Sequence, residues 1–80
     1  MKYSDALIRG IKLVQKTFDG VEISKATMLE SSGVLGRCNY AQIEIEFKII
    51  NVVTYDSQYY HTTIEVRPDS IQYVGQVKAC

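Results

Sequence analysis

The residues able to carry acid–base or nucleophilic chemistry are few in this 80-residue chain, and their spacing assembles no catalytic set. His61 is the single histidine, and no serine, cysteine or acid is spaced to join it as nucleophile, base and orienting group. Glu44 and Glu46 would lie about 7 Å apart on one face of a strand. Such a pair invites a hydrolase interpretation but is more typical of a solvated sheet face. The sequence therefore predicts a protein that is not an enzyme.

The two cysteines, Cys38 and Cys80, have neither a metal-ligand spacing nor the density of a secreted disulfide scaffold. A bridge between them is conceivable, but an exposed, incidental thiol is the favoured interpretation of Cys80. One histidine, two distant cysteines and no acid-rich loop indicate no metal site. The glycines follow no phosphate-binding pattern. We expect no cofactor.

Tyrosines form the more informative group. Four of the six lie after Val53, and Tyr40 begins the strand expected to pair with that region. Tyrosine offers a large, rigid contact area with a polar tip and is frequent in recognition surfaces, although it also favours strands in general. Together with a neighbouring histidine and arginine, these residues make the predicted partner-binding set: Tyr40, Tyr55, Tyr59, Tyr60, His61, Arg67 and Tyr73.

Length and charge restrict the class of protein. Eighty residues predict a single domain, 1–80, near the lower size limit for a core without metal or disulfide support. Nine basic residues balance nine acidic ones, so charge does not by itself favour a nucleic-acid partner. The longest apolar run is far shorter than a membrane span, and no basic-then-apolar leader is present. The expected compartment is the cytoplasm, with no membrane partner.

Alternation of polar and apolar residues over 41–49 predicts the central strand. Ile43, Ile45, Phe47 and Ile49 would share one face, with Gln42, Glu44, Glu46 and Lys48 on the other. The alternation changes phase at Ile49-Ile50. A bent strand with apolar groups on both faces is expected there.

Residues 3–18 carry a helical stripe of apolar residues: Tyr3, Leu7, Ile11, Val14 and Phe18. Ser4 is the expected N-cap, Asp5 and Lys16 suit the two ends of the helix dipole, and Gly20 would close the helix. Gly10 is unfavourable within a helix, which predicts a close approach of the helix to the sheet at that position. The alternative is a helix that stops at Gly10, with 11–18 forming a strand that enters a hairpin at Asp19-Gly20.

The remaining segments complete a meander. A strand is expected from Val21 towards Leu29, although residues 25–28 alternate weakly and could equally form a short helix capped by Ser24. A glycine-containing loop is expected over 30–39. Val34 and Leu35 either tuck under the sheet or form a contact surface. A turn over 55–58, a strand over 59–67, a Pro68-Asp69 turn and a last strand over 71–80 follow. The predicted fold is α+β, with one N-terminal amphipathic helix packed on a four-stranded antiparallel meander.

Residues 44–75 resemble the last two strands of bacterial single-stranded DNA-binding proteins. The resemblance is carried by Tyr60-His61-Thr62-Thr63 and by Asp69-Ser70-Ile71-Gln72-Tyr73-Val74-Gly75. It implies, as an alternative fold, a five-stranded OB-like barrel. It also implies that bases stack on Tyr55 and Tyr59, with Arg37, Lys48 and Arg67 near the phosphates.

The leading expectation is a small interaction module that binds a protein partner through its tyrosine-bearing hairpin and sheet edge. An adaptor or inhibitor of the kind encoded by phages and mobile elements fits this size. The alternative is an OB-like binder of single-stranded nucleic acid. A third possibility is a homo-oligomer that pairs through open sheet edges.

Overall fold

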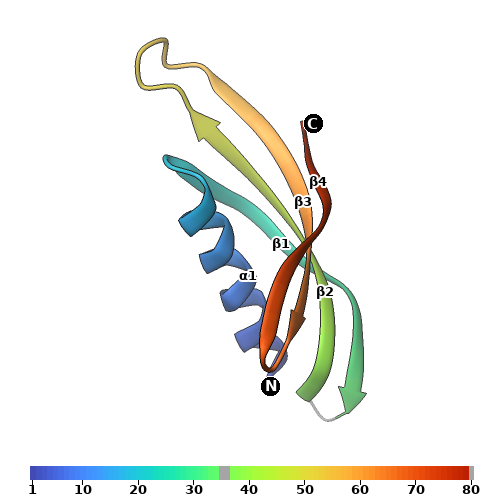
Figure 1. Cartoon of the computed structure of the whole chain (residues 1–80). Helices are drawn as coiled ribbons and strands as arrows, with labels where there is room; N and C mark the ends of the chain where they lie inside the picture. The colour runs from blue at the N-terminus through green and yellow to red at the C-terminus, as the bar shows by residue number, and fades with distance from the viewer. Residues whose placement is uncertain (35–36, 80) are drawn as a thin grey trace.

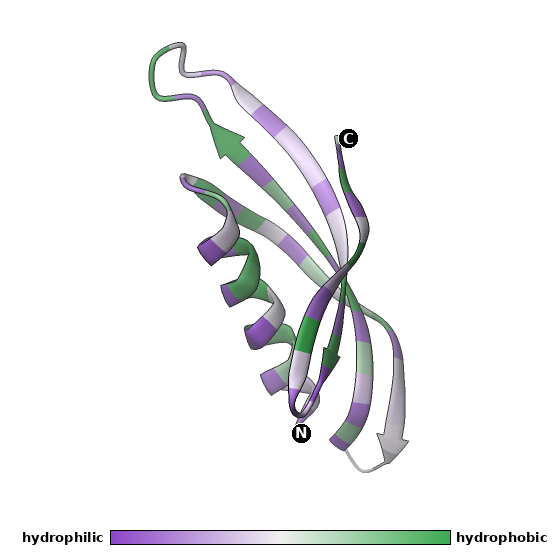
Figure 2. Ribbon diagram, in the orientation of Figure 1, coloured by the Kyte–Doolittle hydropathy of each residue, from purple (hydrophilic) through white to green (hydrophobic). Residues whose placement is uncertain are grey.

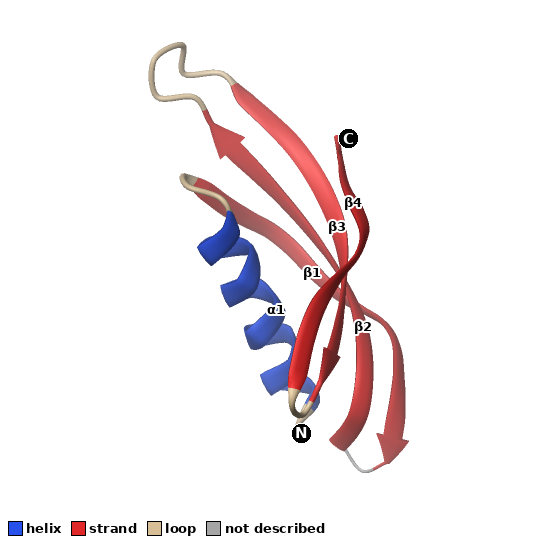
Figure 3. Ribbon diagram, viewed as in Figure 1, coloured by secondary structure: helices blue, strands red, loops and turns tan. Residues whose placement is uncertain are grey.

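One helix and four antiparallel strands make up the described part of the chain, residues 1–34 and 37–79, in a computed structural model (Figure 1). The strands pair in chain order as an open sheet, and the helix lies against one face of it (Figure 3). The elements are α1 (Tyr3–Thr17), β1 (Val21–Val34), β2 (Arg37–Ile50), β3 (Ser57–Arg67) and β4 (Ser70–Ala79). The predicted helix-on-meander architecture is confirmed. The alternatives of a five-stranded barrel and of a strand over 11–18 are wrong.

Helix α1 touches the sheet along a line of small residues. Ala6, Gly10 and Val14 are its buried residues, spaced one helical turn apart. The predicted apolar stripe shares only Val14 with this line. Its other members lie beside the line and are only partly buried: Tyr3, Leu7, Ile11 and Phe18. Small side chains allow the helix axis to approach the strands closely, and the larger residues then close the sides of the contact.

The helix begins earlier than its capping signal predicts. Lys2 is the N-cap and makes no side-chain capping bond, so the prediction of Ser4 as N-cap is wrong. The reason is tertiary, because the chain start is tied to β2. The Met1 amino group donates to the Cys38 carbonyl oxygen at 3.0 Å, and the Cys38 amide donates to the Met1 carbonyl oxygen at 2.7 Å.

Strand β1 is longer than predicted and contains two bulges. The register against β2 shifts between Ile23 and Lys25 and again between Met28 and Glu30. Each shift adds one residue to β1. After the first, Ala26 and Met28 pair with Ile45 and Ile43 on the helix-side face; after the second, Ser31 pairs with Ala41. The bulges account for the weak alternation over 25–28, which is strand and not helix. Residues 30–34, predicted as loop, extend the same strand.

Strand β2 supplies the centre of the core. Ala41, Ile43, Ile45 and Phe47 are fully buried on the helix-side face. Burial of an isoleucine or phenylalanine side chain contributes about 1.5 to 3 kcal/mol to the stability of the fold. The residues between them, predicted to be polar and solvent-facing, lie on the sheet face opposite α1, which we call the open face. The predictions for the Val34 and Leu35 side chains and for Cys80 fall outside the part of the chain that the structure describes.

Strands β3 and β4 follow the predicted alternation. Thr62, Ile64 and Val66 are buried on the helix-side face of β3. A two-residue turn at Pro68-Asp69 connects β3 to β4. The β4 register shifts opposite Thr62, next to Gly75 with its φ of +75°.

Candidate interaction surface at the β2–β3 hairpin

The loop between β2 and β3, residues 51–56, is held by its own hydrogen bonds. Asn51 Oδ1 accepts from the Val53 amide at 2.9 Å and from the Thr54 amide at 3.3 Å. The Asn51 amide donates to the Asp56 carbonyl oxygen at 2.8 Å, which closes the loop. An asparagine that bonds to the backbone two residues further on forms a compact turn by itself. The loop is therefore structured locally, without support from a second segment.

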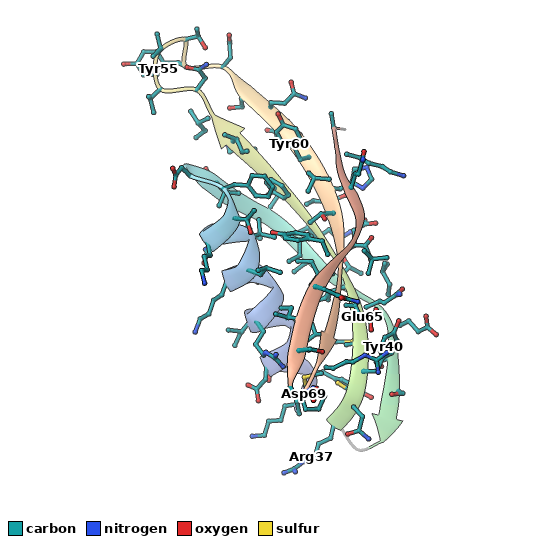
Figure 4. All side chains as sticks on the ribbon, viewed as in Figure 1. Arg37, Tyr40, Tyr55, Tyr60, Glu65 and Asp69 are labelled. Atoms are coloured by element: carbon teal, nitrogen blue, oxygen red, sulfur yellow. The ribbon has the colours of Figure 1, made fainter. Side chains whose placement is uncertain are left out.

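Tyr55 completes this loop in an uncommon backbone conformation. Its φ is +60°, and it is the only described residue other than glycine with a positive φ. The Tyr55 amide donates to the Asn51 carbonyl oxygen at 2.7 Å, and this bond holds the left-handed geometry. That conformation costs an L-residue about 1 to 2 kcal/mol. The strained turn directs the Tyr55 side chain away from the sheet at the far end of the hairpin (Figure 4).

Apolar side chains gather on the same loop and remain in solvent. Val52 is 79% exposed, Val53 83% and Tyr55 84%. Ile50 and Tyr59, on the adjoining strand ends, are 37% and 51% exposed. We call these five residues the hairpin tip; Figure 2 shows the hydrophobic colouring of the loop. Isolated exposed apolar residues are ordinary, whereas grouped ones make a candidate contact surface.

A hollow of about 490 Å³ lies beside the loop. Ile49 and Tyr60 give it apolar lining, and its other residues are polar: Asn51, Thr54, Asp56, Ser57 and Gln58. Tyr60 is fixed by stacking on Phe47, with ring centroids 5.7 Å apart, and Phe47 stacks in turn on Phe18 at 5.3 Å. The hollow is thus lined by one aromatic ring that packs on the core, Tyr60, and by polar side chains of the loop and the start of β3.

The prediction of apolar groups on both faces at the end of β2 is confirmed for Ile50, which lies on the open face, but is wrong for Val52. β2 ends at Ile50, and Val52 and Val53 belong to the turn. The turn was predicted at 55–58 but lies at 51–56, and the exposure of the two valines was not predicted. Asn51 could have indicated the end of the strand, because an asparagine side chain can accept hydrogen bonds from the backbone amides that follow it and so replace strand pairing.

The seven predicted site residues do not meet at one surface. Tyr55 lies at the tip, and Tyr60 and Tyr73 are on the helix-side face. The Tyr73 hydroxyl donates to Thr17 Oγ1 at 2.7 Å, linking β4 to the end of α1. The remaining four are on the open face: Tyr40, Tyr59, His61 and Arg67. Of these, Tyr59 is part of the hairpin tip, near the start of β3. Tyr40 lies towards the opposite end of the sheet (Figure 4).

Charged side chains on the open face largely face opposite charges. Lys48 Nζ lies 3.6 Å from Glu22 Oε2. Arg67 Nε donates to Glu65 Oε1 at 2.7 Å, and its guanidinium carbon lies 4.9 Å from the centre of the Tyr40 ring. Glu46 is directly between Lys25 and His61 on the neighbouring strands. No group of His, Cys, Asp and Glu residues within 1–34 and 37–79 is arranged to hold a metal ion.

Comparison with known proteins gives no relative: no family model, no curated protein and no solved structure matches this chain. Among the described residues no helix is both long and apolar enough to cross a membrane.

Proposed function

We propose that this protein is a small, non-enzymatic interaction module that binds a protein partner through the hairpin tip. The observation that carries the proposal is the grouping of exposed apolar residues. Of eight large hydrophobic residues found exposed in the described chain, five lie between Ile50 and Tyr59. The other three are scattered: Ile8, Leu29 and Val74.

The loop's internal hydrogen bonds support tight binding by such a tip. Ordering a flexible loop on binding costs conformational entropy, and a loop already ordered avoids that cost. Burial of Val52, Val53 and Tyr55 would contribute apolar area, and the hollow beside them would supply polar groups at the margin. An apolar centre with a polar rim is the usual composition of a protein–protein interface.

The outline of the molecule indicates how a partner would be engaged. Its extents are 46 × 18 × 17 Å, and the tip lies at one end (Figure 1). A narrow, convex, apolar end is complementary to a groove or cleft in a partner. A protein that occupies a cleft needs no catalytic residues of its own, so an adaptor or inhibitor is the activity we assign.

Photo-crosslinking combined with tip variants tests this function. A photoreactive phenylalanine analogue at position 53 should crosslink to one partner in extract of the source organism, and the same analogue at Gln15 should not. Val52→Ser with Val53→Ser should abolish capture of that partner. The matched control is Ile8→Ser with Leu29→Ser, which removes two exposed apolar residues elsewhere. Equal loss with both double variants would refute a specific role for the tip.

The alternative function is binding of single-stranded nucleic acid on Tyr55 and Tyr59. It is supported by the exposure of both rings near one end of β3. Against it, Lys48 and Arg67 already face Glu22 and Glu65. Fluorescence polarisation with labelled oligo-dT over a salt series separates the two functions. Salt-dependent binding at micromolar protein, lost in a Tyr55→Ala, Tyr59→Ala variant, would favour the nucleic-acid function.

A further inference from the structure

The two edges of the sheet differ in how they are protected against pairing with another strand. Edge strands expose unpaired backbone groups, and proteins commonly block them with charges or bulges. β1 and β4 are the edges here (Figure 3). Edge β1 has both kinds of block: the charged residues Glu22, Lys25 and Glu30, and register shifts next to Ile23 and Met28.

Edge β4 lacks most of this protection. From Ser70 to Val77 its sequence, SIQYVGQV, contains no charged residue. Its register against β3 is regular from Ser70 to Val74 and shifts only beyond Val74. Five consecutive residues therefore form a regular, uncharged edge. In an antiparallel strand, alternate residues turn their backbone groups outward and can accept a new strand.

We propose that β4 pairs antiparallel with β4 of a second copy of this chain. A two-fold axis through Gln72 uses all five regular residues and keeps residues of the same sheet face opposite one another. On the helix-side face, Ile71 of each copy would oppose Tyr73 of the other. On the open face, Gln72 would oppose Gln72, and Ser70 would oppose Val74.

Self-complementarity favours a second copy over a strand from an unrelated protein. Aromatic and β-branched residues opposite each other stabilise an antiparallel pair, and this axis creates two such pairs of Ile71 with Tyr73. Residues 70–74 contain no charged side chain, so the paired segments bring no like charges opposite each other. The contact is short, which places it among weak interfaces that bury less than about 1,200 Å². The pairing is independent of the hairpin tip, so either proposal can fail without the other.

Analytical ultracentrifugation from micromolar to millimolar protein tests the pairing. The expected result is a reversible shift from a 9.1 kDa monomer to twice that mass. Amide exchange of residues 70–74 should slow as the concentration rises, whereas exchange at the β1 edge should not change. A single 9.1 kDa species at all concentrations would overturn the proposal.

A charge swap at the axis tests the register. Gln72→Lys and Gln72→Glu each place two like charges opposite each other, so each variant alone should remain monomeric. An equimolar mixture of the two should associate, because Lys then opposes Glu. Gln72 is exposed, so both variants should fold, which circular dichroism checks. The control Gln15→Lys, on the exposed side of α1, should dimerise like the unmodified protein. The register would be contradicted if either single variant dimerised alone, or if the equimolar mixture did not associate.

Discussion

Gly10 in α1 lies so close to Ile43 in β2 that the helix has no room for a side chain there. An ideal Cβ atom on Gly10 would be 2.5 Å from Ile43 Cδ1 and 3.3 Å from Ile45 Cδ1. Both isoleucines are fully buried. The glycine that weakens the isolated helix is thus the residue that allows the helix to reach the sheet.

Gly10→Ala should lower the free energy of unfolding, by about 1 to 2 kcal/mol, because overpacking of the core exceeds the gain in helix propensity. Urea denaturation measures this change. Adding Ile43→Val removes the Cδ1 atom, so the double variant should be more stable than the two separate effects predict. If the stability changes of the two single variants simply added in the double variant, the contact between Gly10 and Ile43 would not be the cause of the destabilisation. Gln15→Ala, on the exposed side of the helix, is the control.

Thr62→Val should stabilise the fold by about 1 kcal/mol. Thr62 is 2% exposed, and its Oγ1 atom has no hydrogen-bond partner in the described structure. Valine replaces the unpaired hydroxyl with a methyl group of similar size. Thr63→Val, on the half-buried open face of the same strand, should change stability less. A lower melting temperature for Thr62→Val would mean that the hydroxyl has a partner or a binding role.

Tyr55→Gly should be more stable than Tyr55→Ala by about 1 kcal/mol, since glycine adopts a positive φ without steric cost. Thermal denaturation of the two variants measures the difference. Neither should bind a partner that depends on the Tyr55 ring. If alanine were the more stable replacement, the left-handed conformation at this position would not be maintained in solution.

Arg9→Met should destabilise the fold by about 1 kcal/mol, because Arg9 joins α1 to the β3–β4 turn. Its guanidinium donates to the Arg67 carbonyl oxygen at 2.6 Å and to the Ser70 carbonyl oxygen at 3.3 Å. Amide exchange at Asp69 and Ser70 should become faster. Lys12→Met, one turn away on an exposed position, should leave both quantities nearly unchanged; the same effect from both variants would indicate a general charge effect.

Local patterns were sufficient for most of the fold. Alternation over Ala41–Ile49 identified the central strand and its two faces, since strand side chains alternate strictly. Bulges in β1 were not predictable, because an extra residue is tolerated only where the partner strand and the core above it can accept one. The N-terminal residues were likewise misassigned, since Met1 is held by Cys38, distant in sequence.

Of the candidate site, the sequence by itself determined that tyrosines concentrate after Val53. Only the tertiary structure decided which of those tyrosines are available to a partner. It placed Tyr60 and Tyr73 against the helix-side core and left Tyr55 in solvent beside Val52 and Val53. The physical reason is that residue type sets the tendency of a side chain to be buried, whereas the position of α1 and the end of β2 at Ile50 determine which side chains are covered.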